Sequence, residues 1–282
     1  MTAAFYALKA VGTRARSAAW LARTRGRLDV AGFRILFYHR IARDRDELAV
    51  TPVSFRRQMA YLAGESYRVV DVVEAVDLLE RGALRPRTIG LSFDDGYLDV
   101  AEHALPILAG HGFRATVFVP PGVIDGSAWF DWYKSPPPLL DWDDIAELDQ
   151  DGTLRFEAHS LTHPNLLTLE DHVARHEIAG SKQELERRLG RAVEAFSYPS
   201  GLFGERERRL VAGAGYRIAV SCEPGVNGPG TDRFALRRRQ IDARDSFLDF
   251  RAKLGGGHDS ALPLRAAYRR RRYGVTVLEG HG

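Results

Sequence analysis

Residues 88–119, TIGLSFDDGYLDVAEHALPILAGHGFRATVFV, read as a strand, a helix and a second strand. The run TIGLSF ends at Asp94 and Asp95, a helical pattern follows over 99–110, and ATVFV is again β-rich. A helix that joins two such strands is typical of a parallel sheet with helices outside it. This stretch therefore indicates an α/β fold.

The same alternation extends on both sides of that unit. Strand-like runs lie at 34–39, 88–93, 115–119, 154–159, 195–198, 216–221 and 234–241, with helical patterns at 55–64, 73–81, 99–110, 141–150, 169–189 and 205–214. No glycine-rich dinucleotide loop follows the first strand. The repeat therefore predicts a distorted (β/α) barrel of about seven parallel strands rather than an open doubly wound sheet.

Charge is unevenly distributed along the 282 residues, although 40 basic and 37 acidic residues nearly cancel. Residues 1–30 hold six Lys or Arg and one acid, and residues 265–282 hold five Arg and one acid, which leaves an acidic excess between them. We therefore divide the chain into a basic amphipathic N-terminal segment (1–33), an α/β domain (34–258) and a basic C-terminal tail (259–282).

Composition also bears on location and partners. The single cysteine, Cys222, excludes an intramolecular disulfide, and no stretch has the apolar core of a signal peptide or of a membrane span. We expect a cytoplasmic protein whose basic N-terminal helix either contacts the anionic inner surface of a membrane or packs on the domain as an arm. The arginine run at 269–272 lacks stacking aromatic platforms, so no nucleic-acid partner is expected.

Reactive side chains follow three of the expected strands, and barrel enzymes place their chemistry at the carboxyl ends of strands. These are the Asp94–Asp95 pair, the histidines His159 and His163, and the turn that begins at Tyr198. Two imidazoles, brought together on a helical turn, and one carboxylate suit a divalent metal ion, zinc above all. One aspartate would be a metal ligand and the other would accept a proton. The alternative is structural: one aspartate caps a helix and its neighbour is simply solvated.

Three motifs in this order, LSFDDG (91–96), HSLTHP (159–164) and FSYPSG (196–201), resemble the first three motifs of the polysaccharide deacetylases of the NodB homology type, carbohydrate esterase family four. ILFYHRI (35–41) and LLDWDDIAEL (139–148) resemble the same family, and the resemblance extends from about residue 34 to about 254. It implies a metal-dependent hydrolase that removes the N-acetyl group from an amino sugar of a glycan and releases acetate.

The resemblance also implies roles for individual residues. Asp94 would be the catalytic base, and Asp95, His159 and His163 the metal ligands. The backbone N–H of Tyr198 would stabilise an oxyanion, and Pro199 and Gly201 would shape the substrate groove.

Two departures from the family pattern concern the surroundings of Asp94. The family often pairs this aspartate with an arginine shortly before the tyrosine, but here Arg191 lies seven residues before it. The family's last motif supplies a histidine as general acid, but the corresponding stretch, LRRRQIDARDS (236–246), has none. Asp242, His258 and a metal-bound water are candidate substitutes.

Three further residues are candidates for contact with substrate. His39 follows the first strand, and Trp129 and Trp132 lie on a proline-rich connection where their rings would stack on sugars; all three are equally compatible with structural roles. A non-catalytic glycan-binding barrel and an amidohydrolase for a small non-sugar amide are the alternative functions. The sugar, the chain length, the acyl group and the oligomeric state do not follow from the sequence.

Overall fold

The computed structural model describes residues 3–24, 31–257 and 259. Eight parallel strands form one sheet in the order β10-β1-β5-β6-β7-β8-β9, and β4 pairs with the first half of β5. The strands are β1 (Arg34–Tyr38), β4 (Arg68–Val70), β5 (Thr88–Asp94), β6 (Ala115–Val119), β7 (Leu154–Ala158), β8 (Ala195–Ser197), β9 (Ile218–Val220) and β10 (Arg238–Gln240), and a separate pair joins β2 (Arg40–Ile41) to β3 (Ala49–Val50).

The sheet closes on itself through the segment that leads into β10. Ala219 N–H donates to the carbonyl of Arg233 at 2.7 Å, and Ser221 N–H donates to that of Leu236 at 2.8 Å. These bonds join β9 to the residues before β10, which in turn pairs with β1. The prediction of a distorted barrel of about seven parallel strands is confirmed.

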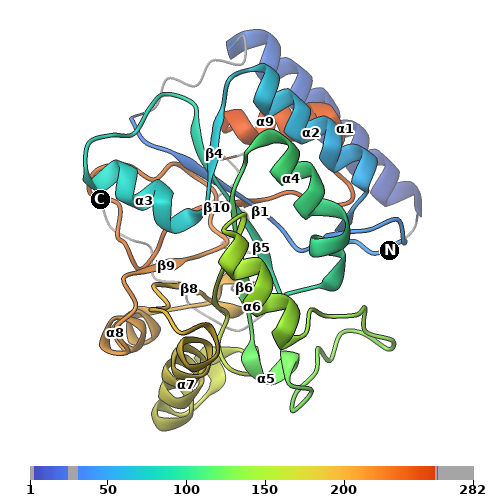
Figure 1. The fold of residues 1–282 in the computed structure, drawn as a ribbon. Helices are drawn as coiled ribbons and strands as arrows, with labels where there is room; N and C mark the ends of the chain where they lie inside the picture. Colours follow the sequence, from blue (N-terminus) through green and yellow to red (C-terminus); the bar gives the residue numbers. More distant parts are fainter. Residues whose placement is uncertain (1–2, 25–30, 258, 260–282) are drawn as a thin grey trace.

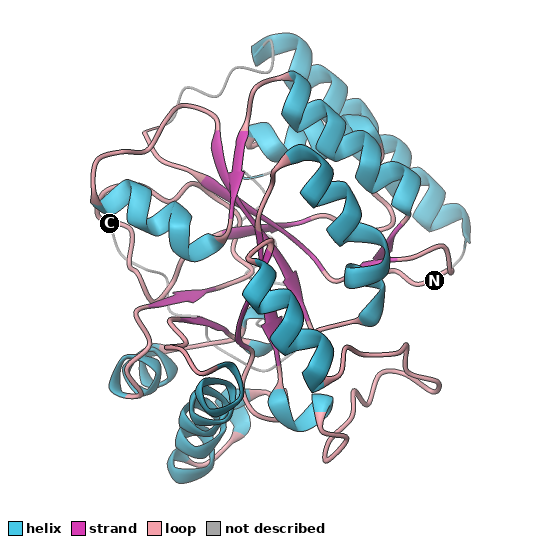
Figure 2. Ribbon diagram, in the orientation of Figure 1, coloured by secondary structure: helices cyan, strands magenta, loops and turns pink. Residues whose placement is uncertain are grey.

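The helices surround the sheet (Figures 1 and 2). They are α1 (Ala3–Thr24), α2 (Pro52–Gly64), α3 (Val72–Glu80), α4 (Leu105–His111, after a π-helical turn at Val100–Ala104), α5 (Pro121–Ile124), α6 (Trp142–Asp151), α7 (Asp171–Leu189), α8 (Glu205–Gly213) and α9 (Phe247–Gly255), with short 3₁₀ turns at Leu166–Thr168 and Pro199–Gly201.

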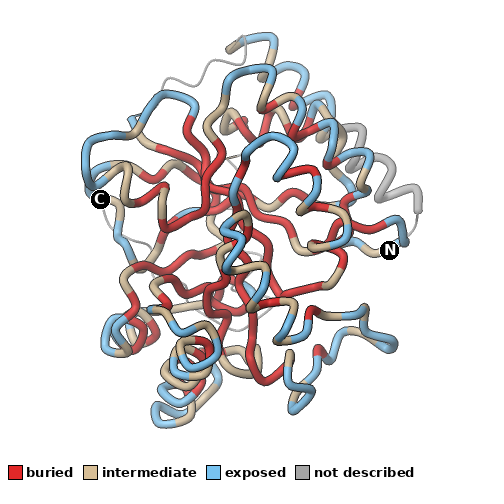
Figure 3. Tube along the Cα trace, viewed as in Figure 1, coloured by how far each residue is buried: buried red, intermediate tan, exposed pale blue. Residues whose placement is uncertain are grey.

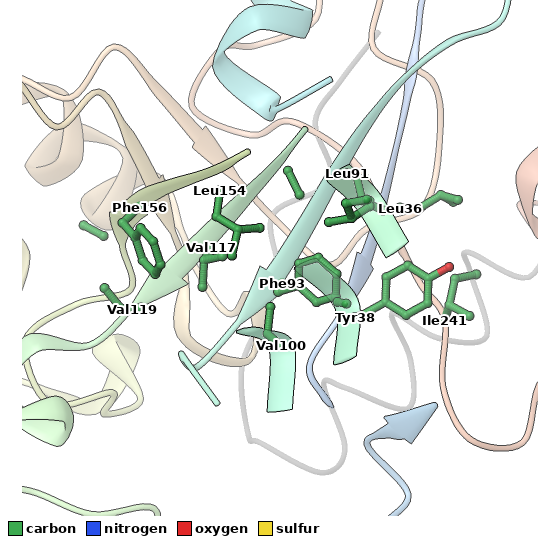
Figure 4. Close-up of a cluster of buried hydrophobic side chains, with 14 of the residues drawn as sticks. Leu36, Tyr38, Leu91, Phe93, Val100, Val117, Val119, Leu154, Phe156 and Ile241 are labelled. Atoms are coloured by element: carbon green, nitrogen blue, oxygen red, sulfur yellow. The ribbon is translucent and has the colours of Figure 1, made fainter. Parts of the chain in front are cut away.

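The two faces of the strands carry different side chains, because successive residues of a strand point to opposite sides. Leu36, Tyr38, Leu91 and Phe93 belong to the main hydrophobic cluster, which packs under the helices (Figure 4). The alternate positions, such as Ile35, pack in a second cluster with α3. Figure 3 shows that the strands are the most deeply buried part of the chain.

The strands β7 and β8 are splayed apart, since only Ala158 and Phe196 pair across this seam. The buried carboxylate of Glu157 accepts the N–H groups of Glu194 and Ala195, each at 2.7 Å, in place of ladder bonds. Arg191 bridges the same carboxylate to Asp149. A network of ion pairs therefore maintains the distortion of the barrel at this point.

The N-terminal helix α1 packs along α9. Ser17 Oγ donates to Asp249 Oδ1 at 2.6 Å, and the Trp20 ring lies against the backbone of Gly255 and Gly257. No described helix is both long and apolar enough to cross a membrane. The basic tail predicted at 259–282 lies outside the described residues apart from Asp259, which bridges Arg34 and Arg239.

Candidate active site

The carboxyl ends of β5 and β7 bring together the residues predicted to bind a metal. Among the described residues, Asp95, His159 and His163 each offer one ligand atom, and these atoms lie within 4.8 Å of one another. Asp95 Oδ1 is 3.6 Å from His159 Nε2 and 3.8 Å from His163 Nε2. All three side chains are almost inaccessible to solvent.

The chemistry of this donor set fits a cation. His159 Nδ1 lies 2.8 Å from the carbonyl oxygen of Ser197, which can only accept, so Nδ1 carries the proton and Nε2 presents its lone pair to the cluster. Burial lowers the pKa of His159 to about 4 and that of His163 well below its ordinary value, which favours the neutral, ligating imidazoles. Asp95 Oδ1 is buried without a hydrogen-bond partner among the described residues. A divalent cation would satisfy it.

Backbone conformations that residues other than glycine rarely adopt bring these candidate ligands together. Asp95 (φ 79°), Ser160 (φ 59°) and His163 (φ 62°) are all left-handed, at a cost of about 1 kcal/mol or more each. The two histidines therefore meet through an irregular loop and not on the helical turn that we expected from their spacing. Such strain is typical of functional sites.

Hydrogen bonds hold the strained loops in place. Asp95 N–H donates to the carbonyl of Phe118 at 2.9 Å, and Ser160 Oγ accepts His163 N–H at 3.0 Å. Glu177 accepts the hydroxyl of Thr162 at 2.7 Å together with two N–H groups of the same loop. The helix α7, which carries Glu177, thus positions the ligand loop.

The partner of Asp94 is Arg238, a residue that the sequence did not reveal. The guanidinium group donates to both oxygens of Asp94, at 2.7 and 2.8 Å, and also to Ser92 Oγ and Ser197 Oγ. It is fully buried and lies 4.3 Å from the centroid of the Phe37 ring. Arg238 therefore pairs with Asp94, the role that the family often gives to an arginine before the tyrosine. Arg191 instead binds Glu157 and Asp149 between β7 and β8.

This ion pair determines the charge of Asp94. Burial alone would raise the pKa of the carboxyl group, but the charge of Arg238 and its hydrogen bonds lower the pKa below its ordinary value. Asp95 differs, because burial and then the neighbouring charge of Asp94 raise its pKa well above the usual range. Asp94 Oδ2 is 4.0 Å from His159 Nε2. The site therefore holds one carboxyl group, Asp94, whose ionised form is stabilised by Arg238, beside a second, Asp95, that has no counter-ion among the described residues.

His39 and Asp242 follow the carboxyl ends of the neighbouring strands β1 and β10. The parallel pairing places Phe37 opposite Gln240, so the next positions on the same face of both strands are 39 and 242. The carboxylates of Asp94 and Asp242 act electrostatically on His39, although burial has the larger effect and lowers its pKa. Asp242 itself accepts Arg244 N–H at 2.9 Å. His258, the other candidate acid, lies outside the described residues.

The N–H of Tyr198, the expected oxyanion donor, has an acceptor within the chain. Its N–H donates to the carbonyl of Val220 at 3.3 Å, in the ladder between β8 and β9, and its hydroxyl donates to the carbonyl of Phe234. Pro199 and Gly201 form the buried turn that follows. A Cβ at Gly201 would lie 2.6 Å from the backbone of Cys222, so only glycine fits this close approach.

An aromatic loop, residues 127–139, borders the cluster. The ring centroids of Phe130 and Trp132 lie 5.5 and 5.3 Å from that of His163, and these two rings stack on each other at 4.6 Å. Trp132 is nevertheless 47% exposed and Trp129 is 74% exposed. The loop places Trp132 against His163, whereas Trp129, three residues earlier, lies on the surface.

Known proteins share this fold and these motifs. Residues 81–219 match the sequence model of the family described as "Polysaccharide deacetylase". YxkH of Bacillus subtilis (strain 168), whose name places it with the polysaccharide deacetylases, is 27% identical over 209 residues, which are 73% of this chain and 70% of that protein. A poly-β-1,6-N-acetyl-D-glucosamine N-deacetylase of Staphylococcus epidermidis is 23% identical over 209 residues, 71% of this chain and 70% of that protein.

Solved structures agree with this placement. The deacetylase PplD of Streptococcus pyogenes, in complex with acetate, superposes with a TM-score of 0.67 at 25% identity over 75% of this chain and 92% of that chain. IcaB from Ammonifex degensii has the same fold, with a TM-score of 0.71 at 24% identity over 80% of this chain and 98% of that chain.

The fold and the site define a barrel hydrolase that acts on carbon–nitrogen amide bonds. The match over residues 81–219 identifies this barrel as a polysaccharide deacetylase domain of the NodB type, carbohydrate esterase family four. The family that the sequence motifs indicated is thereby confirmed.

The buried ion pair makes a testable prediction about stability. Replacing Arg238 by Met leaves the Asp94 charge buried and unpaired, and we expect the free energy of unfolding to fall by about 3–5 kcal/mol in urea denaturation. In an Asp94→Asn background the same replacement costs clearly less. Arg237→Met, at the exposed neighbouring position, is the control and changes stability by no more than about 0.5 kcal/mol. Equal losses in the two backgrounds would show that Arg238 is not stabilised by Asp94.

Proposed function

We propose that this protein hydrolyses the N-acetyl groups of an N-acetylglucosamine polymer, releasing acetate and leaving free amines. The observation that carries the proposal is the pairing of the ion-paired carboxylate of Asp94 with the Asp95–His159–His163 cluster 4.0 Å away. The names of the relatives support the amino sugar, since the staphylococcal protein is a deacetylase of poly-β-1,6-N-acetylglucosamine.

Asp95, His159 and His163 would hold the metal, which we propose to be zinc, because a mixed carboxylate and imidazole set of three ligands is the usual zinc site of hydrolases. When bound, such an ion supplies positive charge that polarises the acetyl carbonyl. The neutral histidines are already in the ligating form. The aspartate gains the counter-ion that its buried oxygen lacks.

Asp94 is the proposed general base. Its low pKa keeps it ionised, and Arg238 holds it in one orientation through two hydrogen bonds. As the oxygen of water bonds to the acetyl carbon, Asp94 takes the proton that the water loses. Arg238 is a positioning residue, because it acts through Asp94 and not on the substrate.

His39 is the proposed general acid. Its imidazole lies within electrostatic reach of Asp94 and of both ligand histidines, and its Nδ1 is buried with no hydrogen-bond partner among the described residues. When the carbon–nitrogen bond breaks, the amine nitrogen needs a proton. His39 would give it from its protonated form, which the nearby carboxylate of Asp94 favours although burial lowers the pKa of the imidazole. In this proposal His39, which follows the first strand, takes the role of the histidine that the family's last motif usually supplies and that this chain lacks there.

The test of the function is acetate release from oligomers of β-1,6-linked and β-1,4-linked N-acetylglucosamine, using protein stripped with a chelator and then loaded with zinc. We expect activity in the loaded protein, and a fall in kcat of about 10²–10⁴-fold in both Asp94→Asn and His39→Asn. Asp143→Asn, at an exposed position on α6, is the control and retains full activity. Hydrolysis of small non-sugar amides without release of acetate from any glycan would refute the proposal.

The exposed tryptophan of the aromatic loop favours a polymeric substrate. A sugar ring next to the reacting unit can cover the apolar face of Trp129, which otherwise stays in water. We therefore propose that Trp129 binds a neighbouring sugar, and that Trp132 contacts the unit whose acetyl group reacts.

Chain-length dependence tests this proposal. Trp129→Ala should lower kcat/KM for a pentasaccharide about fivefold, because about 1 kcal/mol of ring stacking is lost, and should leave the value for a monosaccharide unchanged. The monosaccharide rate is the internal control for folding. An equal fall with both substrates, or no fall with either, would exclude a separate sugar subsite at Trp129.

A further inference from the structure

Three neighbouring helices, α1, α2 and α9, carry a large excess of positive charge. Helices α1, α2 and α9 together contain eight basic residues and one acid, Asp249. Of the basic side chains that the structure describes, Arg14, Arg16, Arg23, Arg56 and Arg57 are exposed and Arg251 is half-buried, whereas Lys253 is buried and paired with Asp245. Asp249 is buried and is bonded to Ser17 and Ser246, so it offers no charge to the surface.

The packing of α1 fixes which of its side chains reach solvent. Ser17 and Trp20 face α9, where the hydroxyl bonds to Asp249 and the indole covers Gly255 and Gly257. Trp20 therefore belongs to the contact between α1 and α9. Arg14, Arg16 and Arg23 are exposed. The helix is both an arm of the barrel and a carrier of outward positive charge.

The adjoining helix α2 extends the same face. Arg56 and Arg57 are exposed, and the guanidinium group of Arg57 lies 4.0 Å from the centroid of the Phe247 ring at the start of α9. None of the five exposed arginines of α1 and α2 forms an ion pair with another described residue, whereas Arg40, in β2, pairs with three aspartates. Their charges are available to a partner.

Apolar side chains accompany these charges. Val53, one helical turn before Arg57, is 74% exposed, and Leu248, next to Phe247, is 41% exposed. Apart from the two tryptophans of the aromatic loop, they are the large apolar side chains most exposed among the described residues. Unpaired arginines beside exposed aliphatic groups match a bilayer interface, where phosphates accept the charge and the acyl boundary accepts the apolar groups.

We propose that the face formed by α1, α9 and α2 docks on a membrane surface of anionic phospholipids. The exposed arginines contact the headgroup phosphates, and Val53 and Leu248 enter the interfacial layer. Figure 1 shows the three helices packed together at one edge of the molecule, with α1 outermost. The proposal does not depend on the reaction that the barrel catalyses.

Cosedimentation with vesicles tests it on the full chain. We expect binding to vesicles of phosphatidylcholine mixed with phosphatidylglycerol, no binding to phosphatidylcholine alone, and loss of binding at high salt. Reversal of two charges in R16E/R23E should weaken binding about tenfold or more. R85E/R175E, which reverses two exposed arginines elsewhere on the surface, is the matched control and should bind as the native chain does.

A second pair of variants separates lipid from other polyanions. V53S/L248S should weaken vesicle binding severalfold without changing binding to soluble polyphosphate, because only a bilayer accepts the apolar groups. Circular dichroism and thermal unfolding establish that each variant is folded. Absence of binding to the anionic vesicles, an equal loss in R85E/R175E, or no effect of V53S/L248S on vesicle binding would each overturn the proposal.

Discussion

The buried ion pair between Asp94 and Arg238 is the interaction on which the rest of the site depends. A lone carboxylate in this interior would take up a proton, because burial raises the pKa of an acid. Arg238 reverses that effect, and its own burial is tolerated because Asp94, Ser92 and Ser197 accept its N–H groups. The pair joins β10 to β5 past the intervening strand β1, so the pairing of β10 with β1 also maintains the charge of Asp94.

The adjacent acids Asp94 and Asp95 are kept chemically distinct by their different neighbours. One has an arginine across two hydrogen bonds, and the other has two neutral imidazoles and an oxygen without a partner. The left-handed backbone at Asp95 turns the second carboxylate away from the first and towards the histidines. Two like charges at one strand end are therefore stable only when a cation from the chain balances one and a cation from solution balances the other.

Much of this could be predicted from the sequence, because local patterns determine it: the alternation of strands and helices gave the barrel, and strand ends gave Asp94, Asp95, His159 and His163. Arg238 was missed because its partner is 144 residues away and only the pairing of β10 with β1 brings it inside. The sequence did contain a clue, because an arginine in a buried strand requires a buried acidic side chain as its partner. For Tyr198 the structure adds what motif matching does not reveal, namely that its N–H donates to the carbonyl of Val220.

The division of roles between the two aspartates is the central claim, and zinc binding measured by isothermal titration calorimetry tests it most directly. Asp95→Asn would remove a proposed ligand, whereas Asp94→Asn would remove the proposed base, which is not among the proposed ligands. The account predicts that Asp95→Asn weakens zinc binding about a hundredfold or more, and that Asp94→Asn binds within a few fold of the native chain. Equal losses in the two variants, or a native chain that binds no zinc, would contradict it.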